Sequence, residues 1–295
     1  CWPSRFDGPR AVVWNPSMWQ FAKGHGTMND FVLLSDPDDE RGLSDAEVRF
    51  LCDRRAGIGG DGVLRAVRAR HIPSWTGDGD VWFMDYRNAD GSIAEMCGNG
   101  LRVFARYLTE EGLEDRPRFD VATRAGLRSA ELLADGRVRV WLGRPEVSAD
   151  AVSVQVGAVT WPATPVDVGN PHAVVLLEPG QDLAGLDLSV QPHWSPEERF
   201  PNGVNCEFVD VLGPGHARLR VHERGVGETM SCGTGTVAVA ARLAADEGRE
   251  HGSYVIDVPG GRVTVDLTPE GAFLTGPAVI VARGRLEPAA LAQPA

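Results

Sequence analysis

The sequence predicts an α/β (α+β) protein that consists of two related halves. Many short apolar runs are bounded by glycine, proline and aspartate, which is typical of strands, and only a few stretches have helical spacing. The third observation is an internal repeat, because residues 88–105 align without a gap with residues 223–240 at an offset of 135. Each copy contains one Cys-Gly-X-Gly turn, at Cys97 and at Cys232. We therefore expect two domains that face each other.

The individual elements follow from the same patterns. Strands are predicted at the apolar runs 31–34, 81–84, 138–142, 173–177 and 278–282. Helices are predicted over 45–53, 98–111 and 233–247, and both long helices begin directly after a cysteine. An asparagine precedes an apolar strand in each half, Asn29 in the first and Asn170 in the second. Residues 1–18 contain three prolines and no periodicity, so we expect a loose N-terminal leader there.

Charge and hydropathy exclude several classes of partner. The chain has 295 residues, with 29 Lys and Arg against 41 Asp and Glu, and a net charge of -12. Because this charge repels polyanions, neither nucleic acid nor an anionic membrane is expected as a partner. No run approaches the ~18 to 20 consecutive apolar residues that a membrane-spanning helix needs, and no signal-peptide pattern opens the chain. We expect a cytoplasmic protein.

The five cysteines direct attention to thiol chemistry. They stand at positions 1, 52, 97, 206 and 232, an odd number with wide spacing, so neither a disulfide framework nor a structural metal site is expected. A pyridoxal phosphate enzyme needs a Schiff-base lysine, and Lys23 is the only lysine in the chain. Nothing around Lys23 indicates a cofactor site. We therefore do not expect pyridoxal phosphate chemistry.

Cys97 and Cys232 are the candidates for thiol chemistry. A thiol at a helix N-terminus has its pKa lowered by unpaired backbone amides and by the helix dipole. The glycines that follow each cysteine would also let those amides approach a substrate carboxylate closely. If the halves close face to face, the two thiols would flank one small amino acid, one as base and the other as acid. That arrangement can invert a stereocentre.

Other candidate residues have plainer interpretations. Cys52 and Cys206 lack flanking glycines and are expected to be buried filler. His172 could be an ordinary loop histidine, and Glu223 with Arg224 could be a solvated charge pair. Residues 57–62 superficially resemble a phosphate-binding loop, but no Gly-Lys-Ser/Thr follows, so nucleotide binding is not expected.

Taken together, the motifs resemble those of the diaminopimelate epimerase family, over about residues 21–286. They are, in order, His25-Gly-Thr-Met-Asn29-Asp-Phe, Gly57-Ile-Gly-Gly-Asp-Gly, Asn88-Ala-Asp-Gly-Ser with Cys97-Gly-Asn-Gly, Gly169-Asn-Pro-His172, Asn202-Gly-Val-Asn205, and Glu223-Arg-Gly-Val-Gly-Glu-Thr with Cys232-Gly-Thr-Gly. The resemblance implies two pseudo-symmetric halves, each a strand barrel around a central helix, with the active site in the cleft between them. We place the leader at 1–18, the first half at 19–142 completed by 278–295, and the second half at 143–277.

The resemblance also implies a reaction. It is the cofactor-independent interconversion of LL- and meso-diaminopimelate, in lysine and peptidoglycan precursor synthesis, with Cys97 and Cys232 as the acid/base pair. The partner is then a small-molecule substrate, and the family likeness makes a homodimer the expected assembly.

Site residues are carried over position by position from the resemblance. Five match residues that hold the distal, non-reacting end of the substrate: Asn29, Asn88, Asn170, Asn205 and Arg224. Four supply backbone amides for the α-carboxylate: Gly98, Asn99, Gly233 and Thr234. Glu223 and His172 match residues that tune the thiols and hold the α-ammonium group. Amides can both donate to a carboxylate and accept from an ammonium, and an arginine can clamp a carboxylate with two bonds.

Some positions depart from the family pattern. Gly62 stands where some members have a glutamine that touches substrate, so that contact would be missing or supplied by backbone. Val226, Met230 and Ala173 also differ from common family residues.

Two alternatives stay open. One is a related cofactor-independent racemase or epimerase of another amino acid, against which the full set of distal polar residues argues. The other, from a different class, is a dithiol redox protein, although such proteins usually place their cysteines two residues apart.

Overall fold

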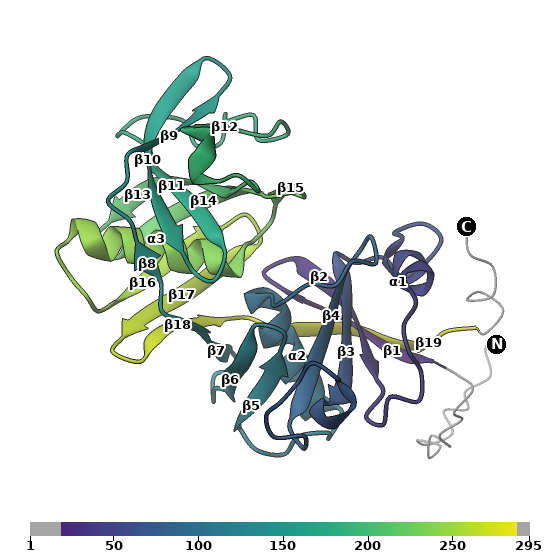
Figure 1. The fold of residues 1–295 in the computed structure, drawn as a ribbon. Helices are drawn as coiled ribbons and strands as arrows, with labels where there is room; N and C mark the ends of the chain where they lie inside the picture. The colour runs from purple at the N-terminus through teal and green to yellow at the C-terminus, as the bar shows by residue number, and fades with distance from the viewer. Residues whose placement is uncertain (1–18, 288–295) are drawn as a thin grey trace, which may run out of the picture.

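The computed structural model describes residues 19–287 and shows two lobes that share one sheet system of 19 strands (Figure 1). The N-terminal lobe, drawn in purple and blue, and the C-terminal lobe, drawn in green and yellow, each surround one long helix. The predicted α+β class with two pseudo-symmetric domains is confirmed. The predicted leader at 1–18 lies outside the described residues.

In the N-terminal lobe, strands surround the helix α2. The elements are β1 (Gln20–Gly26), β2 (Asn29–Ser35), α1 (Asp45–Cys52), β3 (Gly62–Arg68), the short 3-10 helix η1 (Ala69–His71), β4 (Trp82–Asn88), α2 (Gly98–Glu110), β5 (Arg118–Thr123), β6 (Gly126–Leu132), β7 (Val138–Gly143) and, from the far end of the chain, β19 (Val279–Arg285). Helix α2 packs against β1, β2, β3, β6, β7 and β19. Strand β19 pairs antiparallel with β1, so the last described strand lies in the first lobe.

The C-terminal lobe repeats this plan around α3. Its elements are β8 (Glu146–Val147), β9 (Val152–Val156), β10 (Val159–Asp167), β11 (Pro171–Leu176), β12 (His193–Ser195), the 3-10 helix η2 (Glu197–Arg199), β13 (Asn205–Gly213), β14 (His216–Glu223), β15 (Gly227–Thr229), α3 (Gly233–Asp246), β16 (Gly252–Val258), β17 (Gly261–Thr268) and β18 (Gly271–Gly276). Helix α3 packs against β8, β10, β11, β13, β16, β17 and β18.

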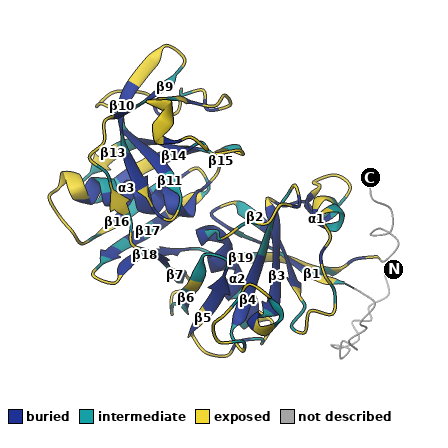
Figure 2. Cartoon of the chain, in the orientation of Figure 1, coloured by how far each residue is buried: buried dark blue, intermediate teal, exposed yellow. Residues whose placement is uncertain are grey.

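The two long helices are buried because their sequences leave them little polar surface. In α3, small and apolar residues continue around the whole helix, which is typical of a helix enclosed on all sides. Figure 2 shows α2 and α3 in dark blue inside their lobes. Each helix begins as predicted, with the sulfur of the preceding cysteine accepting a hydrogen bond from the backbone of Gly100 or Gly235.

The pairing registers show the pseudo-symmetry residue by residue. Strands β2 and β3 run parallel with Phe31 opposite Gly62, and β11 and β13 run parallel with His172 opposite Asn205. Phe31 follows Asn29 by two residues, as His172 follows Asn170. Phe31 and His172 therefore occupy equivalent places in the two lobes.

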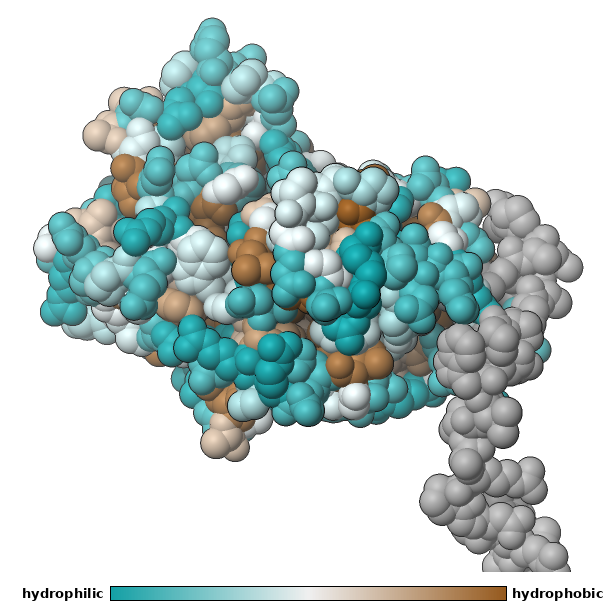
Figure 3. Space-filling view, turned by 60° about the horizontal axis from the view of Figure 1, so that its bottom comes forward, coloured by the Kyte–Doolittle hydropathy of each residue, from teal (hydrophilic) through white to brown (hydrophobic). Residues whose placement is uncertain are grey.

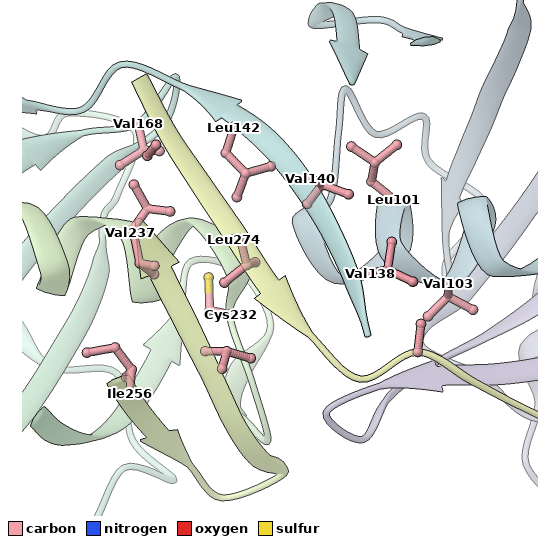
Figure 4. Close-up of a cluster of buried hydrophobic side chains, with 14 of the residues drawn as sticks. Leu101, Val103, Val138, Val140, Leu142, Val168, Cys232, Val237, Ile256 and Leu274 are labelled. Atoms are coloured by element: carbon pink, nitrogen blue, oxygen red, sulfur yellow. The ribbon is translucent and has the colours of Figure 1, made fainter. Parts of the chain in front are cut away.

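A strand pair and a shared core connect the lobes. Strand β18 pairs antiparallel with β7, which carries the sheet from one lobe into the other. One hydrophobic cluster extends through both lobes, and Figure 4 shows Leu142 of β7 and Leu274 of β18 between the two long helices. Both side chains are at most 2% exposed. The lobes are thus joined by backbone pairing and by buried apolar contact.

Glycines allow the backbones of the two lobes to touch near the helix starts. A Cβ atom on Gly233 would lie 3.1 Å from the Cα of Gly98, so the first residues of α3 and α2 are in direct contact. A Cβ on Gly260, in the turn between β16 and β17, would lie 1.8 Å from the carbonyl oxygen of Thr27. Thr27 and Met28 form the β1–β2 turn with positive φ angles of 50° and 63°.

The structure confirms every strand and helix named from the sequence, with ends that shift by one to a few residues. The structure also contains strands with polar or glycine-rich sequences, such as β1, β6 and β15. These segments are strands because they pair with neighbouring strands, and their own sequence patterns do not predict them. Within residues 19–287, no helix has the length and apolar character needed to cross a bilayer. On the face shown in Figure 3, hydrophobic side chains lie in small separate groups among hydrophilic ones.

The Gly260 contact predicts a specific loss of stability. Changing Gly260→Ala should lower the free energy of unfolding by about 1–3 kcal/mol, because the new methyl group forces the turn away from Thr27. Chemical denaturation followed by circular dichroism measures this. Gly42→Ala is the matched control, since a Cβ there meets nothing within 4 Å. Equal stability of the two variants would contradict the close contact.

Candidate active site

A cleft of about 450 Å³ opens where the two helix starts meet. Its lining includes both repeat cysteines and every predicted substrate contact: Asn29, Asn88, Cys97, Gly98, Asn99, Asn170, Asn205, Glu223, Arg224, Cys232, Gly233 and Thr234. Of the predicted site residues only His172 is missing from this lining, because it lies one layer behind Asn170. A cavity of this size suits a small ligand.

The two thiols enter the cleft from opposite lobes. Cys97 is half-buried, and its Sγ lies 3.4 Å from the amide nitrogen of Gly100 and 3.5 Å from Oδ1 of Asn29. Cys232 is buried, with Sγ 3.4 Å from the amide nitrogen of Gly235 and 3.5 Å from the hydroxyl of Thr234. Both are free thiols.

Burial governs the acidity of both thiols. Burial raises the pKa of Cys97 to about 11, although the backbone amide of Gly100 opposes the shift. Burial also raises the pKa of Cys232 well above its ordinary value, and the carboxyl group of Glu223 adds to the increase. The expected net lowering by the helix N-termini is therefore wrong for the ligand-free protein, because desolvation outweighs the amides. A substrate ammonium would bring the positive charge that favours a thiolate.

The starts of α2 and α3 form a site suited to an anion. The first turn of a helix leaves backbone amides without intrahelical partners, and its dipole favours negative charge. Here two such turns, beginning at Gly98 and Gly233, line the same cleft. Asn99 connects them further, since its Nδ2 donates to the carbonyl oxygen of Ser231 at 2.9 Å. The arrangement can hold a carboxylate between the two thiols.

Asn29 is oriented by a charged network on the N-terminal lobe. Its Nδ2 donates to Asp61 at 2.7 Å, which leaves Oδ1 near the thiol of Cys97. Arg54 donates to both Asp61 and Asp30. Lys23 donates to Asp30 at 2.5 Å, so the only lysine of the chain is engaged in an ion pair.

The other polar groups of the cleft are anchored in a similar way. Oδ1 of Asn205 accepts from the backbone nitrogen of Arg224 at 2.9 Å, and its Nδ2 donates to the carbonyl oxygen of Pro171 at 3.1 Å. Asn205 thus positions the exposed Arg224 at the rim. Asn88 donates to Ser92 at 3.0 Å.

Glu223 lies beside the thiol of Cys232. Burial raises the pKa of this carboxyl group, although hydrogen bonds with Thr229 and Cys232 oppose the shift. Its Oε1 accepts from the hydroxyl of Thr229 at 2.5 Å. In this position the carboxyl group and the thiol can each change the pKa of the other.

His172 and Glu207 form a buried pair behind Asn170. Nδ1 of His172 lies 2.6 Å from Oε1 of Glu207, and Nε2 lies 3.1 Å from Oδ1 of Asn170. Sequence reasoning missed Glu207. The available signal was a charged residue between Cys206 and Phe208, in the apolar part of strand β13.

Tyr86 is a second residue that sequence reasoning missed. A Cβ on Gly62 would lie 2.7 Å from Cε2 of Tyr86 and 2.5 Å from the carbonyl oxygen of Arg87, so no side chain fits at position 62. The ring of Tyr86 occupies this place and lines the cleft. The contact at Gly62 was expected to be missing or supplied by backbone. In the structure a side chain of the neighbouring strand β4, Tyr86, lies at this place.

The remaining candidates have structural explanations. Cys52 and Cys206 are buried and do not line the cleft. Gly57 packs against α1, since a Cβ there would lie 1.8 Å from the carbonyl oxygen of Phe50. In the part of the chain that the structure describes, no cluster of three or more His, Cys, Asp or Glu side chains could hold a metal ion.

A two-lobed fold with one cysteine from each lobe in a common cleft provides the two opposed acid/base groups that a racemase or epimerase needs. The fold is similar to that of a solved hydroxyproline epimerase from Agrobacterium vitis, with a TM-score of 0.65 and 18% sequence identity, over 92% of each chain. At this identity the likeness concerns the fold alone.

Sequence comparison identifies the family within this class. The chain belongs to the diaminopimelate epimerase family, whose model matches residues 21–148 and 164–281. It is 49% identical to the diaminopimelate epimerase of Streptomyces coelicolor, over 91% of this chain and 96% of that protein. It is 48% identical to the diaminopimelate epimerase of Thermobifida fusca, over 92% of this chain and 99% of that protein. The resemblance stated from the motifs is confirmed.

The raised thiol pKa values predict a pH profile for alkylation of the ligand-free protein. Because only the thiolate reacts, alkylation of Cys97 should accelerate as the pH rises toward about 11, and alkylation of Cys232 should likewise be slow near neutral pH and accelerate as the pH rises. Iodoacetamide labelling followed by peptide mapping measures each cysteine separately. A midpoint below pH 8 for either thiol would show that burial does not dominate.

Proposed function

We propose that this protein interconverts LL- and meso-diaminopimelate without a cofactor, with Cys97 and Cys232 as the acid/base pair. One observation carries the mechanism: cysteines that cap helices from two lobes open onto the same cleft, at the point where those helices touch. The names of the similar proteins from Streptomyces coelicolor and Thermobifida fusca support the substrate. The product serves lysine and peptidoglycan precursor synthesis in this family.

The geometry supports a two-base reaction. The thiolate of one cysteine removes the proton from the α-carbon, and the electron pair left behind is delocalised toward the α-carboxylate. The amides at Gly98, Asn99, Gly233 and Thr234 are placed to stabilise the charge on that carboxylate. The thiol of the other cysteine then donates its proton to the opposite face of the carbon. In the reverse direction the two cysteines exchange roles.

The distal residues support a long substrate with an amino-acid group at each end. Arg224 can clamp the distal carboxylate, while the amides of Asn29, Asn88, Asn170 and Asn205 can accept from the distal ammonium or donate to the carboxylate. A shorter amino acid would leave Arg224 without a carboxylate to clamp. Tyr86 joins this set, because its ring lines the same cleft.

Glu223 and His172 act on the thiols rather than on the carbon. Glu223 lines the same cleft as Cys232 and is placed to hold the α-ammonium. His172 acts through Asn170, which it contacts at 3.1 Å.

Assembly, location and domain limits complete the proposal. We infer a homodimer from the family likeness. A cytoplasmic location fits a catalyst that needs two reduced cysteines, because reducing compartments keep thiols free. The proposed halves, 19–142 with 278–295 and 143–277, are supported by the pairing of β19 with β1.

Deuterium exchange tests substrate and mechanism together. Reduced protein is incubated with LL-diaminopimelate in deuterium oxide without added cofactor, and meso product and α-deuterium are followed by NMR and mass spectrometry. We expect inversion with incorporation of one α-deuterium, because the incoming proton comes from a solvent-exchanged thiol. If no deuterium enters diaminopimelate but deuterium enters another amino acid of a test panel, the protein is instead a related racemase or epimerase of that amino acid.

Single substitutions test whether both thiols are needed. Cys97→Ala and Cys232→Ala should each reduce epimerisation by at least about 10²–10⁴-fold, because each inversion needs an acid and a base on opposite faces. Coupled measurement of meso-diaminopimelate formation gives the rates. Cys52→Ala is the matched control, since that thiol is buried away from the cleft and should leave turnover near normal. Near-normal turnover in either active-site variant would reject the two-base scheme.

A further inference from the structure

A buried acid and a buried imidazole lie behind the cleft on the side of Cys232. The side chains of His172 and Glu207 are both fully buried, and they are 2.6 Å apart. Oε2 of Glu207 has no hydrogen-bond partner among the described residues. A lone buried carboxylate beside a neutral imidazole would be costly. Oδ1 of Asn170 can only accept, so the hydrogen between it and Nε2 belongs to the imidazole, and the contact between Nδ1 and Oε1 of Glu207 then contains a second hydrogen.

That proton fixes the direction of a chain of hydrogen bonds. Whether Glu207 is protonated or His172 is an imidazolium, Nε2 of the imidazole carries a hydrogen and donates to Oδ1 of Asn170 at 3.1 Å. The amide is then oriented so that its Nδ2 donates to the hydroxyl of Thr234 at 3.3 Å. Since that oxygen already accepts, its own hydrogen is available for Sγ of Cys232, 3.5 Å away.

The N-terminal lobe orients its thiol differently. Oδ1 of Asn29 lies 3.5 Å from Sγ of Cys97, and Asn29 is held by Asp61 rather than by a histidine. The positions equivalent to His172 and Glu207 are Phe31 and Leu64, by the registers of the two parallel strand pairs. A Cβ on Gly100 would meet Leu64 and Phe31 at 3.4 Å, whereas a Cβ on Gly235 would lie 2.8 Å from Oε1 of Glu207. A buried ionisable pair therefore lies behind Cys232, and apolar side chains lie at the equivalent place behind Cys97.

We propose that Glu207 is a positioning residue for Cys232 alone: through His172 and Asn170 it aims the hydroxyl of Thr234 at the sulfur and so stabilises the thiolate. This inference rests on the proposed function in assigning Cys232 to the acid/base pair. It makes the two thiols chemically different although their helix caps are alike. The other carboxyl group near Cys232, Glu223 at the end of β14, lines the same cleft and does not belong to the chain.

Two variants of Glu207 separate orientation from charge. Glu207→Leu introduces the residue found at the equivalent position of the other lobe, Leu64. Without the carboxyl group, His172 can adopt either tautomer and the side-chain amide of Asn170 can flip. Glu207→Gln keeps a donor for Nδ1 of His172, so Nε2 retains its hydrogen and the chain persists. The test measures iodoacetamide alkylation of Cys97 and Cys232 in the same sample, by peptide mapping at fixed pH and without substrate.

The expected result is selective. In Glu207→Leu, alkylation of Cys232 should slow by about tenfold, the effect of about one pKa unit, while alkylation of Cys97 stays within about twofold. Glu207→Gln should keep both rates within about twofold of the parent. Equal slowing of both cysteines would indicate a general structural effect and overturn the proposal. Faster alkylation of Cys232 in Glu207→Leu would show that Glu207 acts as a bare negative charge, and would also overturn it.

Nitrogen-15 NMR of the histidine rings provides an independent readout if Glu207→Leu folds poorly. His172 should carry hydrogen on Nε2 in the parent protein and in Glu207→Gln, and a neutral ring protonated only on Nδ1 in the parent would overturn the proposal. Because neither measurement uses diaminopimelate, their failure is distinguishable from failure of the proposed function. A parent protein without epimerase activity in deuterium oxide rejects that function, whereas unselective thiol reactivity rejects only the role of Glu207.

Discussion

The active site depends on a single backbone contact, the meeting of two helix N-termini at Gly98 and Gly233. Both helix ends carry partial positive charge, so their approach is electrostatically unfavourable on its own. The fold holds them there through the β7–β18 pairing and the hydrophobic cluster shared by both lobes. Residues without side chains at the contact let the amides and the two capping thiols face one small volume. An anion placed between them relieves the repulsion, so the scaffold is organised for a carboxylate before any ligand arrives.

Burial also controls the acidity of the two thiols in this site. With no ligand present, both thiols favour the protonated state because desolvation outweighs the helix amides. The ammonium group of an amino acid would reverse part of this balance by bringing positive charge next to the sulfur atoms. Acidity is therefore coupled to occupancy, and a reactive thiolate is favoured chiefly when substrate is in place. Such coupling limits oxidation of the cysteines between turnovers, since oxidation follows thiolate character.

Much of this architecture was predictable from the sequence because the repeat marks both helix starts directly. Cys97 and Cys232, with their following glycines, indicated the helices, the facing lobes and the anion site, and the asparagines that line the cleft followed from the motifs. The acidity of the thiols was not predictable, because it depends on how much of the surrounding protein excludes water. Glu207 and Tyr86 were missed for a related reason. The pattern of its own strand does not show what either side chain touches, and only the close approach to a glycine, Gly235 or Gly62, does.

The path of the chain end has a consequence for synthesis. One edge of β1 is covered by β19, which comes from residues 279–285, and β7 pairs with β18, from residues 271–276. The first lobe therefore cannot close while the ribosome is still producing the second, and the edges of β1 and β7 stay open until residues 271–285 have emerged. The lobe that is made first is completed last, so the two halves become a folded protein together rather than in succession.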